Sequence, residues 1–172
     1  MGNNNMEVKE RRKFADYLDV APTAEERKYV LLGAGFTQLD ENPSAQTSSK
    51  RYVNDASATK SITGYDDAFP FTADQIRAQE GLDFICNIGE NRLTGAAAES
   101  TLVRVDLDKK VTPVPAEGAV EEYEARLFRV AVEIANFADS DGQMTADGNF
   151  LPKGSVQSGK FNIKTCTFTA EV

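Results

Sequence analysis

The chain contains the stretch Lys28-Tyr-Val-Leu-Leu-Gly-Ala-Gly-Phe-Thr-Gln-Leu39, which is rich in apolar and β-branched residues and has no helical period. A polar stretch, Asp40 to Ser49, follows it and holds Asn, Pro, three Ser and two acidic residues, which is typical of a loop. From Lys50 to Phe71 the sequence again favours extended structure. The three stretches together predict a long β-hairpin around which the rest of the chain packs.

Length and composition indicate an ordinary folded domain. The 172 residues fit a single domain spanning 1–172, and a domain of this size buries roughly 70% of the surface of its unfolded chain. The composition is 41% hydrophobic and 27% charged, which predicts a real core. The net charge of −8 opposes contact with a phosphate backbone, so we do not expect sequence-specific nucleic-acid binding.

The sequence predicts neither a membrane span nor a signal peptide, and it predicts a short arm near the N-terminus. No run of about 18 apolar residues is present, so we expect no membrane span, and the first six residues lack the apolar core of a signal peptide. We therefore expect the chain to be made and kept in a cytoplasm. Residues 1–10 predict a disordered leader. Phe14, Tyr17 and Leu18 follow at helix-like spacing and predict an arm pinned to the body.

One helix is predicted, from Ala73 to Ile88. Thr72 and Gln75 have the spacing of a capping box, in which the two side chains satisfy free backbone donors at a helix start. Leu82, Ile85 and Cys86 then fall on one helical face, which we expect to pack on a sheet.

The remaining sequence alternates as strands do. Val103, Val105 and Leu107 alternate with Arg104 and Asp106, as a half-buried strand requires. In the longest predicted strand one face is apolar, and the other is mixed and carries Arg129 and Glu133; the apolar positions are Phe128, Val130, Val132 and Ile134. Asp139 to Gly142 predicts a tight turn, and two further strands are predicted at Gln143–Leu151 and Val156–Thr169. About seven or eight strands and one helix predict a mostly β fold, a β-sandwich or partly open β-barrel flanked by the helix.

The cysteines and short motifs do not support an active site. Cys86 and Cys166 have no His in the chain to complete a zinc site, so we expect buried inert thiols, with a single disulfide as the alternative. Ser57 and Lys60 match the spacing of a Ser-x-x-Lys nucleophile, but that serine belongs at the start of a buried helix, and here Ala58 to Tyr65 is predicted to be a strand.

Two further motifs also lack the context they need. The stretch Gly154 to Lys160 comes close to a phosphate-binding loop, but Phe161 stands where Ser or Thr is required and no helix follows. The Asp139 to Gly142 turn lacks the spaced oxygen ligands of a calcium loop. We therefore predict no catalytic, cofactor-binding or metal site, and no enzyme.

Several segments, in their order along the chain, carry a resemblance to a known family. The segments are Arg11–Leu18, Tyr29–Pro43, Lys50–Asn54, Lys60–Tyr65, Phe69–Ile76 and Phe128–Glu133. Together they resemble the major tail protein, or tail tube protein, of long-tailed bacteriophages that infect Gram-positive bacteria. None of these segments is a catalytic signature, so the resemblance rests on their order and on the match of length and charge.

The resemblance implies a tail-tube β-fold with terminal arms, whose subunits form hexameric rings that stack into a hollow tube. It implies that the chain's main partner is itself, with the tape-measure, tail-tip and tail-terminator proteins of the same phage as further partners. DNA would be transiting cargo that is not tightly bound, and no membrane would be involved. The location implied is the virion tail, after synthesis and assembly in the cytoplasm of the bacterial host.

A tube of rings needs two contacts between copies, one that closes a ring and one that continues along the axis. Exposed strand edges suit the first contact. For the second we predict the polar loop and the terminal arms, because they lack the apolar residues to fold alone. The predicted contact residues in the loop are Asp40, Glu41, Asn42, Pro43, Gln46 and Thr47. Arg129 and Glu133 are the predicted lumen residues.

Three other functions remain open from the sequence. The first is a monomeric β-sandwich binding module that uses the polar loop for recognition. The second is the ring-forming tube protein of a bacterial secretion system. The third is a small hydrolase that would depend on Ser57 and Lys60.

Overall fold

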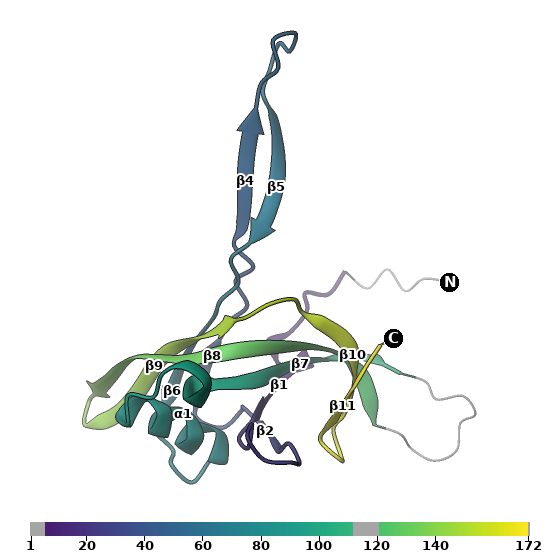
Figure 1. Ribbon diagram of the computed structural model, residues 1–172. Helices are drawn as coiled ribbons and strands as arrows, with labels where there is room; N and C mark the ends of the chain where they lie inside the picture. The colour runs from purple at the N-terminus through teal and green to yellow at the C-terminus, as the bar shows by residue number, and fades with distance from the viewer. Residues whose placement is uncertain (1–5, 112–120, 172) are drawn as a thin grey trace.

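The structure, a computed structural model, describes residues 6–111 and 121–171. This part of the chain is mostly β, with a curled, half-barrel sheet and one α-helix, which confirms the predicted fold class (Figure 1). The strands are β1 (Phe14–Asp19), β2 (Tyr29–Leu31), β3 (Phe36–Leu39), β4 (Ala45–Lys50), β5 (Thr59–Tyr65), β6 (Phe69–Asp74), β7 (Glu99–Lys110), β8 (Glu122–Ser140), β9 (Gln143–Pro152), β10 (Gln157–Asn162) and β11 (Thr167–Ala170). The helices are α1 (Glu80–Glu90) and the short 3-10 helices η1 (Arg11–Lys13) and η2 (Gly95–Ala98).

The main sheet is curled but open. Its strands follow the order β2-β1-β7-β8-β9-β6-β3, and all the neighbouring pairs are antiparallel. Only residues 32–35 connect β2 to β3, although these strands lie at opposite ends of the path. The sheet must therefore curl until its two ends are near each other. β10 branches from the first part of β8 and pairs with β11, which adds a second layer.

Two hydrophobic clusters fill the two sides of the curled sheet. The larger cluster lies inside the curl, where Phe128, Val130 and Val132 of β8 meet Ile85 and Ile88 of α1. The smaller cluster lies on the opposite face, beneath β10 and β11; it contains Tyr17, Tyr29, Val103, Val105, Ala125, Leu127 and Phe161. Successive side chains of a strand point to opposite faces, so β8 supplies both clusters. Each fully buried large side chain contributes about 1.5–3 kcal/mol to folding.

The predicted start of the helix was wrong. The helix begins at Glu80, and Thr72 belongs to strand β6, so it cannot cap a helix. The alternation of buried Phe69, Phe71 and Ala73 with partly buried neighbours has the period of a strand, and burying the two phenylalanines outweighs the local capping signal. The predicted packing face was correct, because Leu82, Ile85 and Cys86 are all fully buried.

The predicted helical arm was also wrong. After η1, residues 14–19 form strand β1, which lies between β2 and β7. Tyr17 and Leu18 are buried on opposite faces of the sheet, and Phe14 is partly buried. Residues 1–5 of the predicted leader lie outside the described residues, and residues 6–10 form neither helix nor strand.

The prediction of the Asp139 to Gly142 turn was correct, and the prediction of the last strand was partly wrong. The Asp139 to Gly142 turn is confirmed, with φ of 52° at Asp141 and 82° at Gly142, as a tight hairpin between β8 and β9 requires. The predicted Val156–Thr169 strand is instead divided into β10 and β11. The Asn162 side chain accepts hydrogen bonds from the backbone N–H groups of Lys164 and Thr165, and this turns the chain.

Gly148 allows β9 to lie close to β8, and we predict that Gly148→Ala destabilises the fold. A Cβ atom there would lie 1.9 Å from the backbone oxygen of Glu133, so the strands would have to separate. We expect a loss of about 2 kcal/mol or more in the free energy of unfolding, measured by urea denaturation. Gly64→Ala on β5 is the matched control, since nothing lies within 4 Å of its Cβ position. Equal losses in the two variants would contradict the packing argument.

Candidate functional site

The most distinctive feature is a two-stranded hairpin that projects from the body (Figure 1). β4 and β5 pair with each other from Ala45–Tyr65 at the root to Lys50–Thr59 near the tip, and they form a sheet of their own. The predicted loop was therefore wrong for residues 45–49, which are strand. It was also wrong to expect residues 51–53 to be strand, because they lie in the tip. A solvated strand needs no apolar alternation, so its sequence resembles a loop.

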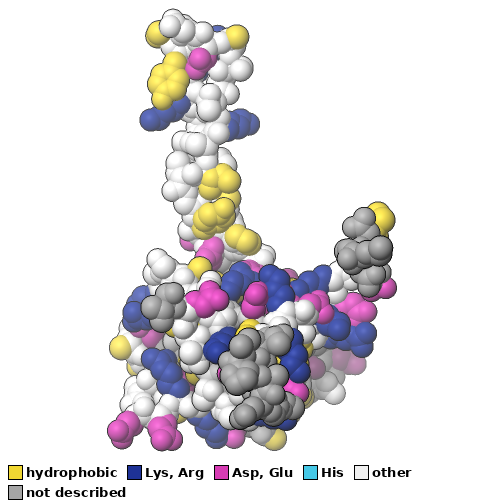
Figure 2. Space-filling model, turned by 90° about the vertical axis from the view of Figure 1, so that its right-hand side faces the viewer, with side chains coloured by type: hydrophobic (Ala, Val, Ile, Leu, Met, Phe, Trp, Pro, Cys, Tyr) yellow, Lys and Arg dark blue, Asp and Glu magenta, His cyan; other side chains and the backbone are white. Residues whose placement is uncertain are grey.

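The hairpin has no buried residue on either face. Its large hydrophobic side chains are exposed: Ile62 by 60%, Tyr65 by 63%, Tyr52 by 64% and Val53 by 101% (Figure 2). A two-stranded hairpin is at best marginally stable in water, and exposed aromatic and aliphatic side chains on it favour contact with another surface. The hairpin is thus a candidate contact surface.

The hairpin also differs in charge from the rest of the chain. Residues 45–65 contain three basic residues, Lys50, Arg51 and Lys60, and one acidic residue, Asp55. The whole chain, by contrast, has a net charge of −8. A basic projection on an acidic protein is attracted to an acidic or mixed surface, including that of another copy.

The structure separates the predicted loop residues into two groups. Gln46 and Thr47 lie on β4 in the projecting hairpin and are exposed. Asp40 and Pro43 are also exposed, but they lie at the root. Asn42 forms a β-bridge with Ala68 at the root, and Glu41 is held in an ion-pair network. The Glu41 carboxylate is bound within the chain, and its role as a contact residue stays a prediction.

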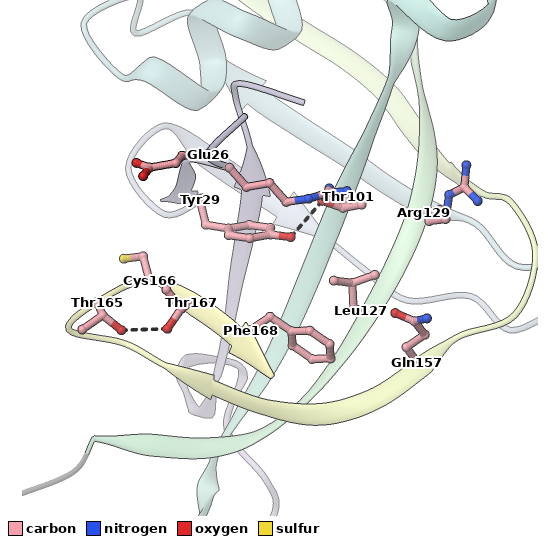
Figure 3. A pocket seen from close by; sticks show the side chains of 11 residues that line it. Glu26, Tyr29, Thr101, Leu127, Arg129, Gln157, Thr165, Cys166, Thr167 and Phe168 are labelled. Atoms are coloured by element: carbon pink, nitrogen blue, oxygen red, sulfur yellow. Dashed lines mark hydrogen bonds between the residues drawn. The ribbon is translucent and has the colours of Figure 1, made fainter. Parts of the chain in front are cut away.

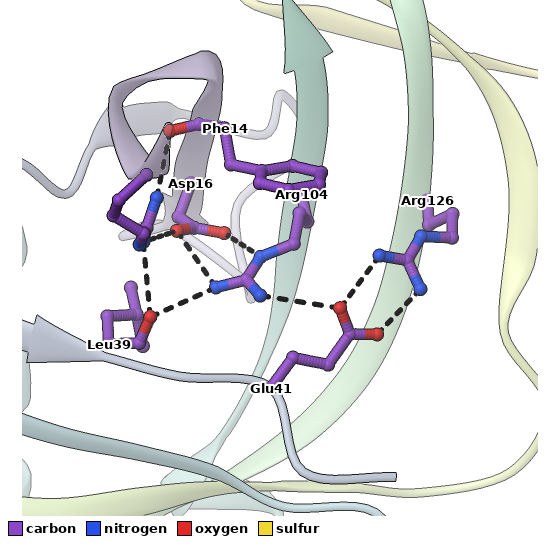
Figure 4. A network of polar contacts seen from close by, with 7 residues as sticks. Phe14, Asp16, Leu39, Glu41, Arg104 and Arg126 are labelled. Carbon is purple, nitrogen blue, oxygen red and sulfur yellow. Dashed lines mark hydrogen bonds and ion pairs between the residues drawn. The ribbon is translucent and has the colours of Figure 1, made fainter. Parts of the chain in front are cut away.

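The network at the hairpin root is centred on the buried guanidinium of Arg104 (Figure 4). Arg104 Nε donates to Asp16 Oδ1 at 2.7 Å, and its Nη1 lies 3.3 Å from Glu41 Oε2. Arg126 donates two hydrogen bonds to the same Glu41 carboxylate, at 2.6 and 2.8 Å. Arg11 donates to Asp16 at 2.5 Å. The network ties the chain entering the hairpin to β1, β7 and β8.

The sequence did not predict this network. Alternation placed Arg104 on the solvent side of its strand, but β7 is covered on both faces for much of its length, and Arg104 is only 6% exposed. A charged residue within an apolar strand can be recognised as buried only when the residues that pair with it are known. Asp16 and Glu41 lie 88 and 63 positions away from it in the sequence, so no local pattern could have linked them.

The Glu41 carboxylate makes stability depend on pH. Burial raises the pKa of Glu41, but hydrogen bonds and charge from Arg126 and Arg104 outweigh it and hold the pKa below the ordinary value of 4.5. A lowered pKa in the folded state stabilises the protein above the unfolded pKa, and this contribution is lost as pH falls through the folded value.

We therefore predict that Glu41→Gln lowers the thermal midpoint at pH 7. The difference from the parent protein should begin to shrink as the pH falls below the ordinary pKa of 4.5, and it should vanish once the pH lies below the lowered folded-state pKa, where Glu41 is protonated in both states. Thermal unfolding at a series of pH values measures this. Asp40→Asn is the matched control, because Asp40 lies next in the chain but is exposed. A constant difference between Glu41→Gln and the parent from pH 7 to pH 3 would contradict the assignment.

A second feature is an open groove between β2 and β11, with a volume of about 890 Å³ (Figure 3). Most of its lining residues are polar or charged; Phe168 adds a partly buried ring, and Leu127 and Tyr29 are nearly buried. The Tyr29 hydroxyl lies 3.1 Å from that of Thr101. Cys166 also lines it. Among the described residues Arg129 has no acidic partner, whereas the neighbouring Arg27 is paired with the buried Asp19.

A third feature is the polar outer face of β6, β8 and β9, opposite the larger cluster. Its cross-strand rows are Pro70–Asn149–Glu133, Thr72–Asp147–Asn136 and Asp74–Thr145–Ala138. These side chains are exposed or partly buried, and Glu133 accepts a hydrogen bond from Asn149 at 3.2 Å. The rows contain three acidic residues and no Lys or Arg. The predicted lumen residues thus separate, with Glu133 on this acidic face and Arg129 in the groove.

The motifs that suggest chemistry lie in unsuitable places. Lys160 is on strand β10, so the phosphate-loop motif is not followed by a helix. Ser57 and Lys60 lie on the exposed hairpin. Both cysteines are free, which excludes the disulfide. Cys86 is buried as predicted, and burial raises the pKa of its thiol, but the prediction was wrong for Cys166, which is only partly buried.

The described residues also offer no metal or membrane-spanning feature. In residues 6–111 and 121–171, no three His, Cys, Asp or Glu side chains are grouped so that they could hold a metal ion. No helix within the same ranges is both long and apolar enough to cross a membrane.

These features define a mostly β protein whose candidate sites are surfaces: a partnerless hairpin, a groove and an acidic sheet face. The sequence matches no protein-family model and no curated protein.

Proposed function

We propose that this chain is a structural subunit that assembles into rings stacked as a tube, the tail tube of a long-tailed bacteriophage. The observation that supports this most is the projecting hairpin, which buries nothing in its own chain. A feature of this kind costs conformational entropy to order, so it is best explained by burial against a neighbouring subunit.

The ring contact would use strand edges. β2, β3 and β11 each pair on one side only within the described residues, so their other backbone groups are open to a neighbour. Pairing between two different edges is a head-to-tail contact, and such contacts close into a ring when the rotation allows. The hexameric number comes from the resemblance alone.

The stacking contact would use the hairpin. A head-to-tail contact along an axis never closes, so it continues as a filament, and it needs a projection on one end and a receiving surface on the other. The basic hairpin would meet the more acidic body of the subunit in the next ring.

The lumen would be lined by the acidic face of β6, β8 and β9. Glu133, Asp147 and Asp74 repel phosphate groups, so DNA passing through would not be held by counterion release. Glu133 fits this role better than Arg129, which lies in the groove. On the resemblance, the tape-measure, tail-tip and tail-terminator proteins would be further partners.

Electron microscopy of the purified protein in negative stain tests the proposal. Hollow, regularly striated tubes or stacked rings are expected at high protein concentration, with sedimentation velocity showing large species. A protein that stays monomeric at every concentration and ionic strength would overturn it and favour a monomeric binding module, which could use the same exposed hairpin for recognition. Tubes alone would not distinguish a phage tail from the tube of a secretion system.

A further inference from the structure

We infer that the tip of the hairpin on one subunit occupies the groove between β2 and β11 of the next subunit along the tube. This inference rests on the proposed function, and it names the receiving surface for the hairpin. The tip consists of residues 51–58, and the groove is lined by Tyr29, Leu127, Cys166 and Phe168 among others.

The positions of the tip and the groove suit a head-to-tail stack. Figure 1 shows the hairpin rising from one end of the body, whereas β2 and β11 lie toward the other end. When such a projection and such a concavity lie at opposite ends of one subunit, each copy can give its tip to one neighbour and receive a tip from another. The contact then repeats along the axis without closing.

The chemistry of the two surfaces is complementary. The tip presents Tyr52 and Val53, whose side chains are 64% and 101% exposed, and the groove offers the partly buried ring of Phe168 among its polar lining residues. A volume of about 890 Å³ is large enough for both tip side chains. Burying an aromatic anchor in a pocket of a partner is the usual source of affinity at an interface.

The charges also match. Arg51 and Asp55 flank the two apolar side chains of the tip, while Glu26 and Arg129 line the groove. Neither Glu26 nor Arg129 has an ion-pair partner among the described residues, and neither does Asp55. Opposite charges at both ends of the contact would fix its register.

The native Cys166 provides a direct test. In Val53→Cys, the introduced thiol would lie beside Cys166 of the next subunit, and a disulfide forms only when the two Cα atoms approach within about 7 Å. Oxygen with a copper–phenanthroline catalyst accepts the two electrons and two protons released when the two thiols couple. Each subunit carries one thiol of each kind, so a non-reducing gel should show a ladder of multimers. Cys86 is fully buried and does not compete.

Two controls keep the result specific. Val53→Cys combined with Cys166→Ser should give no ladder, and Thr47→Cys, which places the thiol on the exposed shaft, should give none either. A parent protein that forms tubes while Val53→Cys gives no ladder, or only dimers that survive Cys166→Ser, overturns the inference and leaves the proposed function intact. A parent protein that never forms rings or tubes overturns both.

A charge exchange provides a second readout. Arg129→Glu should raise the protein concentration at which long assemblies form by about tenfold, because it reverses one charge of the pair at the groove rim. Arg129→Glu with Asp55→Lys should recover the parent behaviour. Lys109→Glu, an equal charge change on an exposed pair remote from the groove, is the control. Unchanged assembly in Arg129→Glu counts against the charge pairing.

Discussion

Replacing Thr47–Thr63 with Asn-Gly is expected to abolish tube formation and leave a folded monomer. The replacement joins Gln46 to Gly64, which are paired across the root of the hairpin, through a two-residue turn that suits that geometry. It removes the whole tip and shaft while keeping the root, the Asn42–Ala68 bridge and the Glu41 ion pairs. Electron microscopy and sedimentation velocity measure the loss of assembly.

The fold should tolerate this deletion because the removed residues bury nothing. All the members of the two hydrophobic clusters lie outside residues 47–63. The thermal midpoint is expected to stay within about 2 °C of the parent value, as for surface changes that touch no core. Ser48→Ala with Ser61→Ala, which removes one exposed cross-strand hydrogen bond and keeps the hairpin's length, is the control and should still form tubes. Tubes of normal length from the deletion variant would contradict the role given to the hairpin.

The sequence predicted the features that depend on local pattern. The mostly β class, the strand β8 with its apolar face, the Asp139 to Gly142 turn and the buried face of α1 all follow from periods of two or 3.6 residues or from turn chemistry. Predictions failed where a tertiary contact overrides local preference. Thr72 and Gln75 have the right spacing for a helix cap, but Phe69 and Phe71 gain more from burial in β6.

The candidate surfaces were only partly predictable. The sequence identified the region of the hairpin but not its strands, because a strand that is solvated on both faces has no hydrophobic alternation. The groove could not be predicted, since it combines residues of β2, β7, β8, β10 and β11 that meet only after the sheet has curled. Arg129 and Glu133 looked equivalent in the sequence, because both fall on the same face of one predicted strand. The structure places them against different neighbours.

Arg104→Ala is expected to destabilise the protein by about 3–5 kcal/mol, because it leaves the carboxylate of Asp16 buried without its main partner. Asp16 has no exposed side-chain surface, and Arg104 has 6%. The loss should also free Glu41 from one of its two cations, so the hairpin root should become more mobile. Urea denaturation measures the first effect, and amide hydrogen exchange at Asn42 and Ala68 measures the second.

Two further variants separate the buried pair from the exposed part of the network. Arg126→Ala removes a cation that is 41% exposed, and its cost should not exceed about 1 kcal/mol. Asp16→Leu with Arg104→Met replaces the buried pair with apolar side chains of similar size, which should recover most of the stability lost in Arg104→Ala. The double variant would still leave Glu41 without its second cation, so faster exchange at the hairpin root should persist even when global stability returns. If Arg104→Ala cost no more than Arg126→Ala, the network would be a surface feature, and the hairpin would be held by its backbone bridge alone.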